Sequence, residues 1–227
     1  DHLSRHVRVL ASDAFEGRAP ATPGEEKTIA YVVDELKKAG VQPGGERGTW
    51  TQDVPLVRAQ VEGAVSASLR IGSETQTLTN GDDVVLQSLS PVDRVALVDA
   101  PLVFVGYGIT APERGWDDYK GAVVLVNDPD FETDAPGAFD GRAVTYYGRW
   151  TYKYEELARQ GAAGVLIVHE TAPAAYGWAT VRASGLSPVF DIPRPDAATY
   201  HTLLRGWMQR DLAVSLFKRA GLDFEVE

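Results

Sequence analysis

GAVVLVNDP (residues 121–129) and GAAGVLIVHE (residues 161–170) are the two stretches that decide the fold. Their apolar runs, Ala122–Val126 and Val165–Val168, are continuous and rich in β-branched residues. A strand that is covered on both faces has this pattern, because neither of its faces meets water. We therefore predict a buried strand in each run.

A helix is predicted between the two strands. Tyr154, Leu157 and Ala158 recur at i, i+3 and i+4, which places them on one helical face. Gly161 stands where a left-handed residue commonly ends a helix, because glycine has no Cβ to clash there. The order strand, long loop, helix, strand favours a crossover that makes the two strands parallel in one sheet.

The remaining strands are predicted from short alternating runs separated by turn residues. These runs are Val65–Ile71, Thr75–Thr79, Val84–Gln87, Arg94–Val98 and Leu102–Val105. The stretch after His169 reads as a loop up to Arg194 because it is rich in glycine and proline. A final helix is expected with Leu212, Ala213, Leu216 and Phe217 on one side.

The first part of the chain is expected to be helical. Leu3, Val7 and Leu10 fit a short amphipathic helix. A second helix is predicted to begin with a capping box, in which Thr22 is the N-cap and Glu25 reaches back to it. This helix is expected to stop at Gly40, and Trp50–Leu56 reads as a strand beyond it.

The predicted fold class is α+β, with a small helical N-terminal segment followed by a β-rich domain that contains the strand–helix–strand crossover. The composition changes near residue 57, where the short alternating runs begin. We accordingly divide the chain into residues 1–56, residues 57–205, and a closing helical segment at residues 206–227.

Charge and composition exclude several classes of protein. The net charge of −10 argues against nucleic-acid and anionic-membrane partners, since both require a basic surface. Without cysteine, the 227-residue chain has neither a disulfide nor a thiolate metal site. No apolar run approaches the roughly 18 residues of a membrane span. Because the chain starts at Asp1 inside a helical pattern, we expect that any leader has been removed.

Two blocks of the sequence resemble one protein family. The first block resembles the opening of bacterial M28-type zinc aminopeptidases. It comprises Leu10–Arg18, Thr22–Gly24, Trp50–Gln52 and Val54–Leu56. The second block resembles the protease-associated (PA) domain that is inserted into many of these enzymes. It comprises Val103–Ile109, Trp116–Tyr119, Gly121–Val126, Tyr146–Trp150 and Gly161–Glu170.

The resemblance implies a zinc-dependent peptidase, but its metal ligands are missing from this chain. Family members hold two zinc ions through His, Asp and Glu residues that begin with a His-x-Asp motif. None of His2, His6, His169 and His201 is followed two residues later by aspartate. We therefore expect no catalytic or metal-binding residue and no cofactor here, with the two zinc ions in a C-terminal peptidase domain beyond Glu227. The family also implies export to the periplasm or the extracellular space.

The candidate contact residues for a peptide substrate are Tyr146, Tyr147 and Arg149. They lie in the densest aromatic cluster of the sequence, and aromatic residues with an arginine are favoured where a partner docks. The long connection that precedes them, residues 131–144, is also typical of functional loops. Packing of this loop on the following helix is the equally weighted structural alternative.

Two other functions are compatible with the sequence. The chain could be a stand-alone module that binds peptides or glycans through the surface at Tyr146–Trp150. It could also be a self-contained hydrolase that uses His169, Glu170 and Asp128, because residues at the ends of buried parallel strands often line ligand crevices. We rank the hydrolase last.

Overall fold

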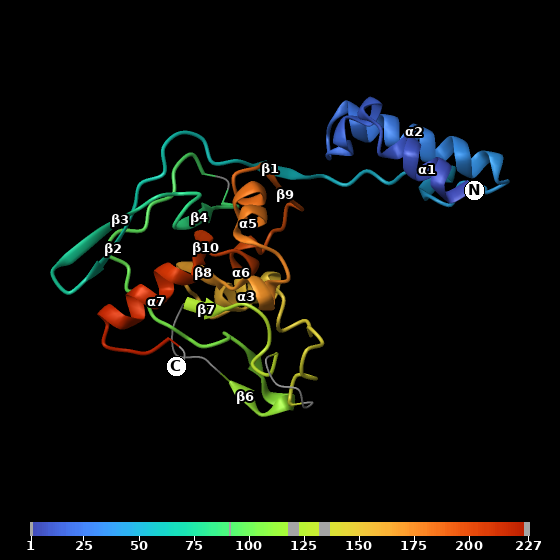
Figure 1. The fold of residues 1–227 in the computed structure, drawn as a ribbon. Coiled ribbons are helices and arrows are strands. Elements are labelled where there is room, and N and C mark those ends of the chain that lie inside the picture. Colours follow the sequence, from blue (N-terminus) through green and yellow to red (C-terminus); the bar gives the residue numbers. More distant parts are fainter. Residues whose placement is uncertain (1, 91, 118–122, 132–136, 225–227) are drawn as a thin grey trace. The chain divides into compact units, whose positions relative to one another are not determined.

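The computed structural model describes residues 2–90, 92–117, 123–131 and 137–224, and its chain forms two compact units. The first unit contains residues 1–56 and the second contains residues 57–227 (Figure 1). Both helices and sheets are present, so the class is α+β. In the described part of the chain, no helix is long and apolar enough to cross a membrane.

The first unit is built on two helices, α1 (His2–Leu10) and α2 (Pro23–Lys38). Two 3-10 helices accompany them, η1 (Asp13–Arg18) and η2 (Glu46–Gly48). Thr22 is the N-cap of α2, but the predicted capping box is wrong. The Thr22 hydroxyl donates to the Ala19 carbonyl, and Glu25 accepts from the Ala21 amide one residue too early.

Helix α2 stops before Gly40, as predicted. This glycine has φ +79°, a left-handed conformation that costs a residue with a Cβ more than it costs glycine. The Val41 amide donates to the Leu36 carbonyl at 3.0 Å, which completes a Schellman motif and satisfies a carbonyl that the helix leaves free.

Polar side chains connect α1 to α2. The Arg5 guanidinium donates to Glu35 Oε2 at 2.7 Å, and His6 Nδ1 lies 2.8 Å from the Tyr31 hydroxyl. The hydrogen bond from Arg5, helped by one from Lys38, lowers the pKa of Glu35 to about 2. The ionised carboxylate therefore holds the two helices together.

Acid is expected to loosen the contact between α1 and α2. The folded-state pKa of Glu35 lies below its ordinary value of 4.5, so its stabilising contribution is complete above pH 4.5. That contribution is lost as the pH falls through about 2. Hydrogen exchange of the α1 amides should accelerate over this range in the wild type but not in Glu35→Gln. The matched control is Asp34→Asn, since Asp34 pairs with Lys38 within α2 and with no described residue of α1. Amide protection that stays constant down to pH 2 would contradict the prediction.

The second unit is organised around a four-stranded sheet in the order β4-β10-β8-β7. Strands β10, β8 and β7 are parallel, and β4 runs antiparallel at the edge. The bounds are β4 (Val84–Gln87), β7 (Val123–Leu125), β8 (Gly164–His169) and β10 (Leu204–Gln209). The predicted crossover is confirmed, because α3 (Trp150–Arg159) connects the parallel strands β7 and β8.

Helices cover both faces of this sheet (Figure 1). On one face, α7 (Arg210–Arg219) packs Leu212 and Leu216 against Val168 and Met208. On the other face, α3 packs Tyr154 and Leu157 against strands β7 and β8. Helix α5 (Trp178–Gly185) covers β4 so closely that a Cβ at Gly185 would lie 2.0 Å from a Val85 methyl carbon. The result is a three-layer core.

Three small sheets complete the unit. The hairpin of β2 (Ala67–Ile71) and β3 (Glu74–Leu78) matches two of the predicted runs. Strand β1 (Val57–Ala59) pairs with β9 (Val189–Asp191), and β5 (Thr110–Ala111) pairs with β6 (Trp116–Asp117). The remaining elements are η3 (Pro112–Arg114), α4 (Thr171–Ala174) and α6 (Ala197–Tyr200).

Several predicted elements are wrong. Trp50–Leu56 and Arg94–Val98 form no strand, and Leu102–Val105 contains only an isolated β-bridge at Phe104. The stretch predicted as a loop after His169 contains α4, α5 and β9. The expected boundary at residue 205 falls inside β10, so residues 206–227 are no separate segment but belong to the second unit. Of the predicted strand Ala122–Val126 and the motif Trp116–Tyr119, residues 118–122 lie outside the described residues.

Candidate functional site

Tyr146, Tyr147 and Arg149 lie in the turn that leads directly into α3. The Tyr146 carbonyl accepts from the Arg149 amide at 3.1 Å, and Arg149 is the N-cap residue of α3. Tyr146 is 58% exposed, whereas Tyr147 is half-buried. The structure therefore brings the three predicted residues together, with one aromatic ring open to a partner.

The two tyrosine rings pack on either side of Tyr152. The centroid of Tyr152 lies 5.5 Å from that of Tyr146 and 5.0 Å from that of Tyr147, both in edge-to-face geometry. Phe139 extends the row, 5.8 Å from Tyr147. Edge-to-face pairs stabilise by about 0.5–1.5 kcal/mol beyond the area that they bury. These ring contacts therefore help to fix the position of the exposed Tyr146 side chain.

Both tyrosine hydroxyls donate to carboxylates. Tyr146 donates to Glu155 Oε2 at 2.8 Å, and Tyr147 donates to Glu113 Oε1 at 2.6 Å. These hydrogen bonds raise the pKa of each tyrosine, and the bond from Tyr147 lowers the pKa of Glu113. The phenols accordingly stay protonated at neutral pH, so they can contact a ligand but cannot act there as general bases.

A buried carboxylate anchors the turn from beneath. Asp128, which is fully buried in the turn that follows β7, accepts from the Thr145 amide at 2.8 Å and from the Thr145 hydroxyl at 2.9 Å. A Cβ at Gly148 would lie 2.9 Å from the Asp128 carboxyl carbon, so only glycine allows this close approach. The residues on either side of Tyr146 and Tyr147 are thus fixed to the sheet through one side chain.

Arg149 differs from the tyrosines because no described residue accepts a hydrogen bond from its guanidinium. Its side chain is exposed at the start of α3. An exposed arginine beside an exposed aromatic ring can bind a carboxylate or a carbonyl group of a partner while the ring contacts apolar groups. The arrangement suits binding.

The three residues of the hydrolase alternative engage separate partners. His169 Nε2 lies 2.9 Å from the Tyr176 carbonyl, and its ring contacts the rings of Tyr176, Trp178 and Trp207. Burial lowers the pKa of His169. Glu170 pairs with Arg210 at 3.1 Å, and Asp128 is bound to Thr145. Across the described ranges, no group of three or more His, Cys, Asp or Glu residues is placed to hold a metal ion.

Sequence reasoning missed the acidic partners of the tyrosines. Glu155 lies nine residues after Tyr146. Glu113 lies 34 residues before Tyr147. Helical phase could have suggested Glu155, but no local pattern connects Glu113 to the turn.

Comparison with known proteins identified no relative. No family model, no curated protein and no solved structure matches this chain.

Proposed function

We propose that this chain is the non-catalytic N-terminal and PA-domain portion of an exported, M28-like zinc aminopeptidase. In this proposal the second unit borders the active-site cleft and influences which peptides enter it. The zinc ions belong to the peptidase domain, and no residue of this chain is assigned to them. The observation that carries the proposal is the anchored aromatic turn, which presents an exposed Tyr146 beside an unpaired Arg149.

The exposed apolar side chains of the first unit also favour a partner domain, as this proposal requires. Its helices expose several large apolar side chains, and glycine at position 24 is its one buried residue among those that the structure describes. The exposed set includes Leu3, Val7, Ile29, Val32 and Leu36. A two-helix unit of this size rarely buries enough apolar surface to be stable alone. Docking of these exposed side chains on the peptidase domain would remove them from water.

The purified 227-residue chain is expected to bind no stoichiometric zinc and to cleave no aminoacyl-nitroanilide. The reason is that the proposed metal ligands belong to the partner domain. Metal content after dialysis and the release of nitroaniline measure the two properties. Turnover that a chelator abolishes would contradict the proposal.

Peptide binding to the isolated chain tests the role of Tyr146. The change Tyr146→Ala removes the exposed ring and is expected to weaken binding about tenfold, the usual effect of losing one aromatic contact. Tyr146→Phe is the matched control, since it keeps the ring and loses only the bond to Glu155. Fluorescence anisotropy with a labelled peptide library measures both. Equal binding by Tyr146→Ala and the wild type would contradict a contact role for this residue.

A stand-alone peptide- or glycan-binding module is the second candidate. The same exposed ring and guanidinium favour it, because neither needs a peptidase domain to bind. A reading frame that continues into a His-x-Asp segment supports the aminopeptidase proposal, whereas glycan binding without such a segment supports the module. The self-contained hydrolase has less support, since His169, Glu170 and Asp128 contact three separate partners.

A further inference from the structure

Arg205 is a cation without an acceptor near the centre of the sheet. It lies on β10 between β4 and β8, and its guanidinium carbon is 5.5 Å from the centroid of the Tyr154 ring. Its Nε is buried and has no hydrogen-bond partner. Among the described residues, no carboxylate pairs with this guanidinium.

This arrangement is energetically unusual. A buried donor without an acceptor destabilises the folded state, and more so when the group is charged. Burial lowers the pKa of Arg205, which reflects the same loss of water. The Asp191 carboxylate acts on Arg205 electrostatically, but it is paired with His201 Nε2 at 2.5 Å. The charge of Arg205 is therefore not neutralised by a direct contact.

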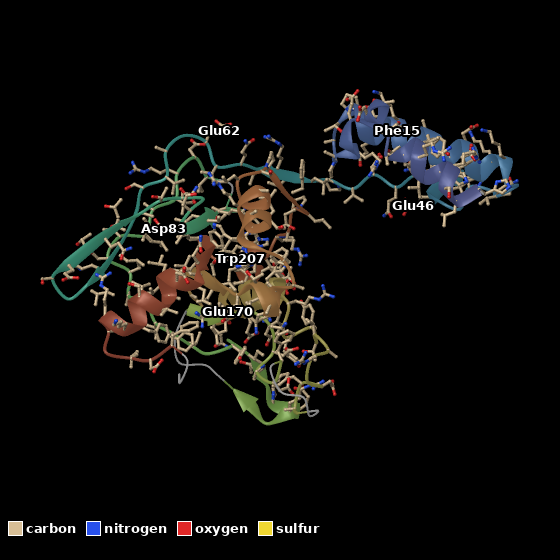
Figure 2. All side chains as sticks on the ribbon, viewed as in Figure 1. Phe15, Glu46, Glu62, Asp83, Glu170 and Trp207 are labelled. Carbon is tan, nitrogen blue, oxygen red and sulfur yellow. The ribbon has the colours of Figure 1, made fainter. Side chains whose placement is uncertain are left out.

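The Tyr154 ring of α3 contacts the cation and begins a row of aromatic rings. Tyr154, which contacts Arg205, also packs edge-to-face against Trp150 at 6.0 Å. Trp150 is 41% exposed, so the row of rings continues to the surface. Trp207 (Figure 2) lies two residues after Arg205 on β10, and alternate residues of a strand share one face.

A second arginine of this region also has no acidic partner among the residues that the structure describes. The guanidinium carbon of Arg194 lies 4.5 Å from the centroid of the Tyr200 ring. Tyr200 ends α6, a helix that packs against α3, and the Asp191–His201 ion pair closes the segment that carries Arg194 and Tyr200. In a chain with a net charge of −10, arginines without acidic partners need a specific explanation.

We propose that Arg205 anchors a binding site for an oxyanion, a carboxylate or phosphate group, between β10 and α3. The planar guanidinium fork matches the two oxygens of either group, and the flanking rings suit an apolar or aromatic remainder of the ligand. Because the acidic chain repels anions at long range, recognition here depends on local contacts. The site is separate from the turn at Tyr146, and it does not rest on the proposed function.

The test follows the Nε–H signal of Arg205 in ¹H–¹⁵N NMR spectra of the whole chain. Sodium phosphate and sodium acetate are titrated separately against sodium chloride at constant ionic strength. The expected result is a saturable shift with phosphate or acetate, at a midpoint at least tenfold below that of chloride. A response to phosphate alone or to acetate alone supports the site and identifies the group that it takes.

Variants separate the site from unspecific anion binding. Arg205→Lys keeps the charge but loses the fork, and it is expected to weaken anion binding at least tenfold, measured on neighbouring amide signals. Arg194→Gln is the matched control at a second unpaired arginine, and the Arg205 shift should persist in it. Should Arg205→Lys fail to fold, the wild-type titration still decides, since its signal belongs to Arg205 itself. A linear, chloride-like response, or unchanged anion binding by Arg205→Lys, would overturn the proposal.

Discussion

Replacing Asp128 by alanine is expected to lower the free energy of unfolding of the second unit by about 2–4 kcal/mol, because two hydrogen-bond donors lose their acceptor. The change deprives the Thr145 amide and hydroxyl of their acceptor. It also removes the negative charge that faces Lys153, a fully buried residue whose charge acts on Asp128. The turn with Tyr146 and Tyr147 should loosen as well.

Urea denaturation followed by tryptophan fluorescence measures this loss. Asp128→Asn is the matched control, because its amide keeps an acceptor for the Thr145 N–H and a donor for the Thr145 oxygen. The asparagine variant should lose clearly less stability than the alanine variant at pH 7. Equal stability of Asp128→Ala and the wild type would show that Asp128 does not anchor the turn.

The difference in stability between the wild type and Asp128→Asn is expected to depend on pH. Burial raises the pKa of Asp128 above its ordinary value of 3.8, against the opposing effect of the bonds from Thr145. The folded protein therefore holds this proton more tightly than the unfolded chain does. The stability of the wild type relative to Asp128→Asn should be greatest below pH 3.8 and should fall as the pH rises through the raised pKa. A difference that grows with pH would contradict this assignment.

Replacing Gly206 by alanine is expected to cost about 2–3 kcal/mol, at the upper end of the range for overpacking a core. A Cβ at this position would lie 2.4 Å from the Val85 carbonyl oxygen and 2.9 Å from a Leu86 methyl carbon. The first of these atoms belongs to the backbone of β4, so it cannot move without disturbing the pairing of β4 with β10. The Gly206 carbonyl also accepts from the Tyr154 hydroxyl at 2.8 Å.

Gly177→Ala is the matched control for this substitution. No atom lies within 4 Å of a Cβ built at Gly177, and its φ of −82° suits alanine. Thermal unfolding monitored by circular dichroism should show a clear loss for Gly206→Ala and a loss below about 1 kcal/mol for Gly177→Ala, the size expected from a cap change alone. Equal midpoints for the two variants would contradict the predicted clash.

The parts of the fold that follow from the sequence are those with local signals. Strands β7 and β8 are continuous apolar runs, and Gly161 ends α3 with φ +79° as its position predicts. The buried residues of α3 and α7 follow from helical spacing. Each of these patterns is complete within about ten neighbouring residues, so no knowledge of distant contacts is needed.

The central strand β10 could not be predicted because its sequence interrupts the pattern. Arg205 and Gly206 stand in the middle of LRGWMQ, and neither is typical of a strand that is covered on both faces. Pairing with β8 and β4 overrides these preferences. In contrast, Trp50–Leu56 has strand-like residues but finds no partner, so it stays irregular.

The candidate site, too, was predictable from local sequence signals but not in its long-range contacts. Aromatic density pointed to Tyr146 and Tyr147, and a charged residue in an aromatic cluster pointed to Arg149. The anchoring role of Asp128 and the contact of Tyr147 with Glu113 depend on residues far apart in the sequence. Such contacts become visible only when the crossover has placed β7 beside the turn.

Because β10 spans residues 204–209, it is the last strand of this sheet to be synthesised. Strands β7 and β8 can pair as soon as both have left the exit tunnel, but β4 must wait until β10 follows it. At about 5–20 residues per second, that wait is on the order of ten seconds. During this interval Val84, Val85 and Leu86 remain uncovered, and a chaperone that holds this short apolar run would protect the nascent protein from aggregation.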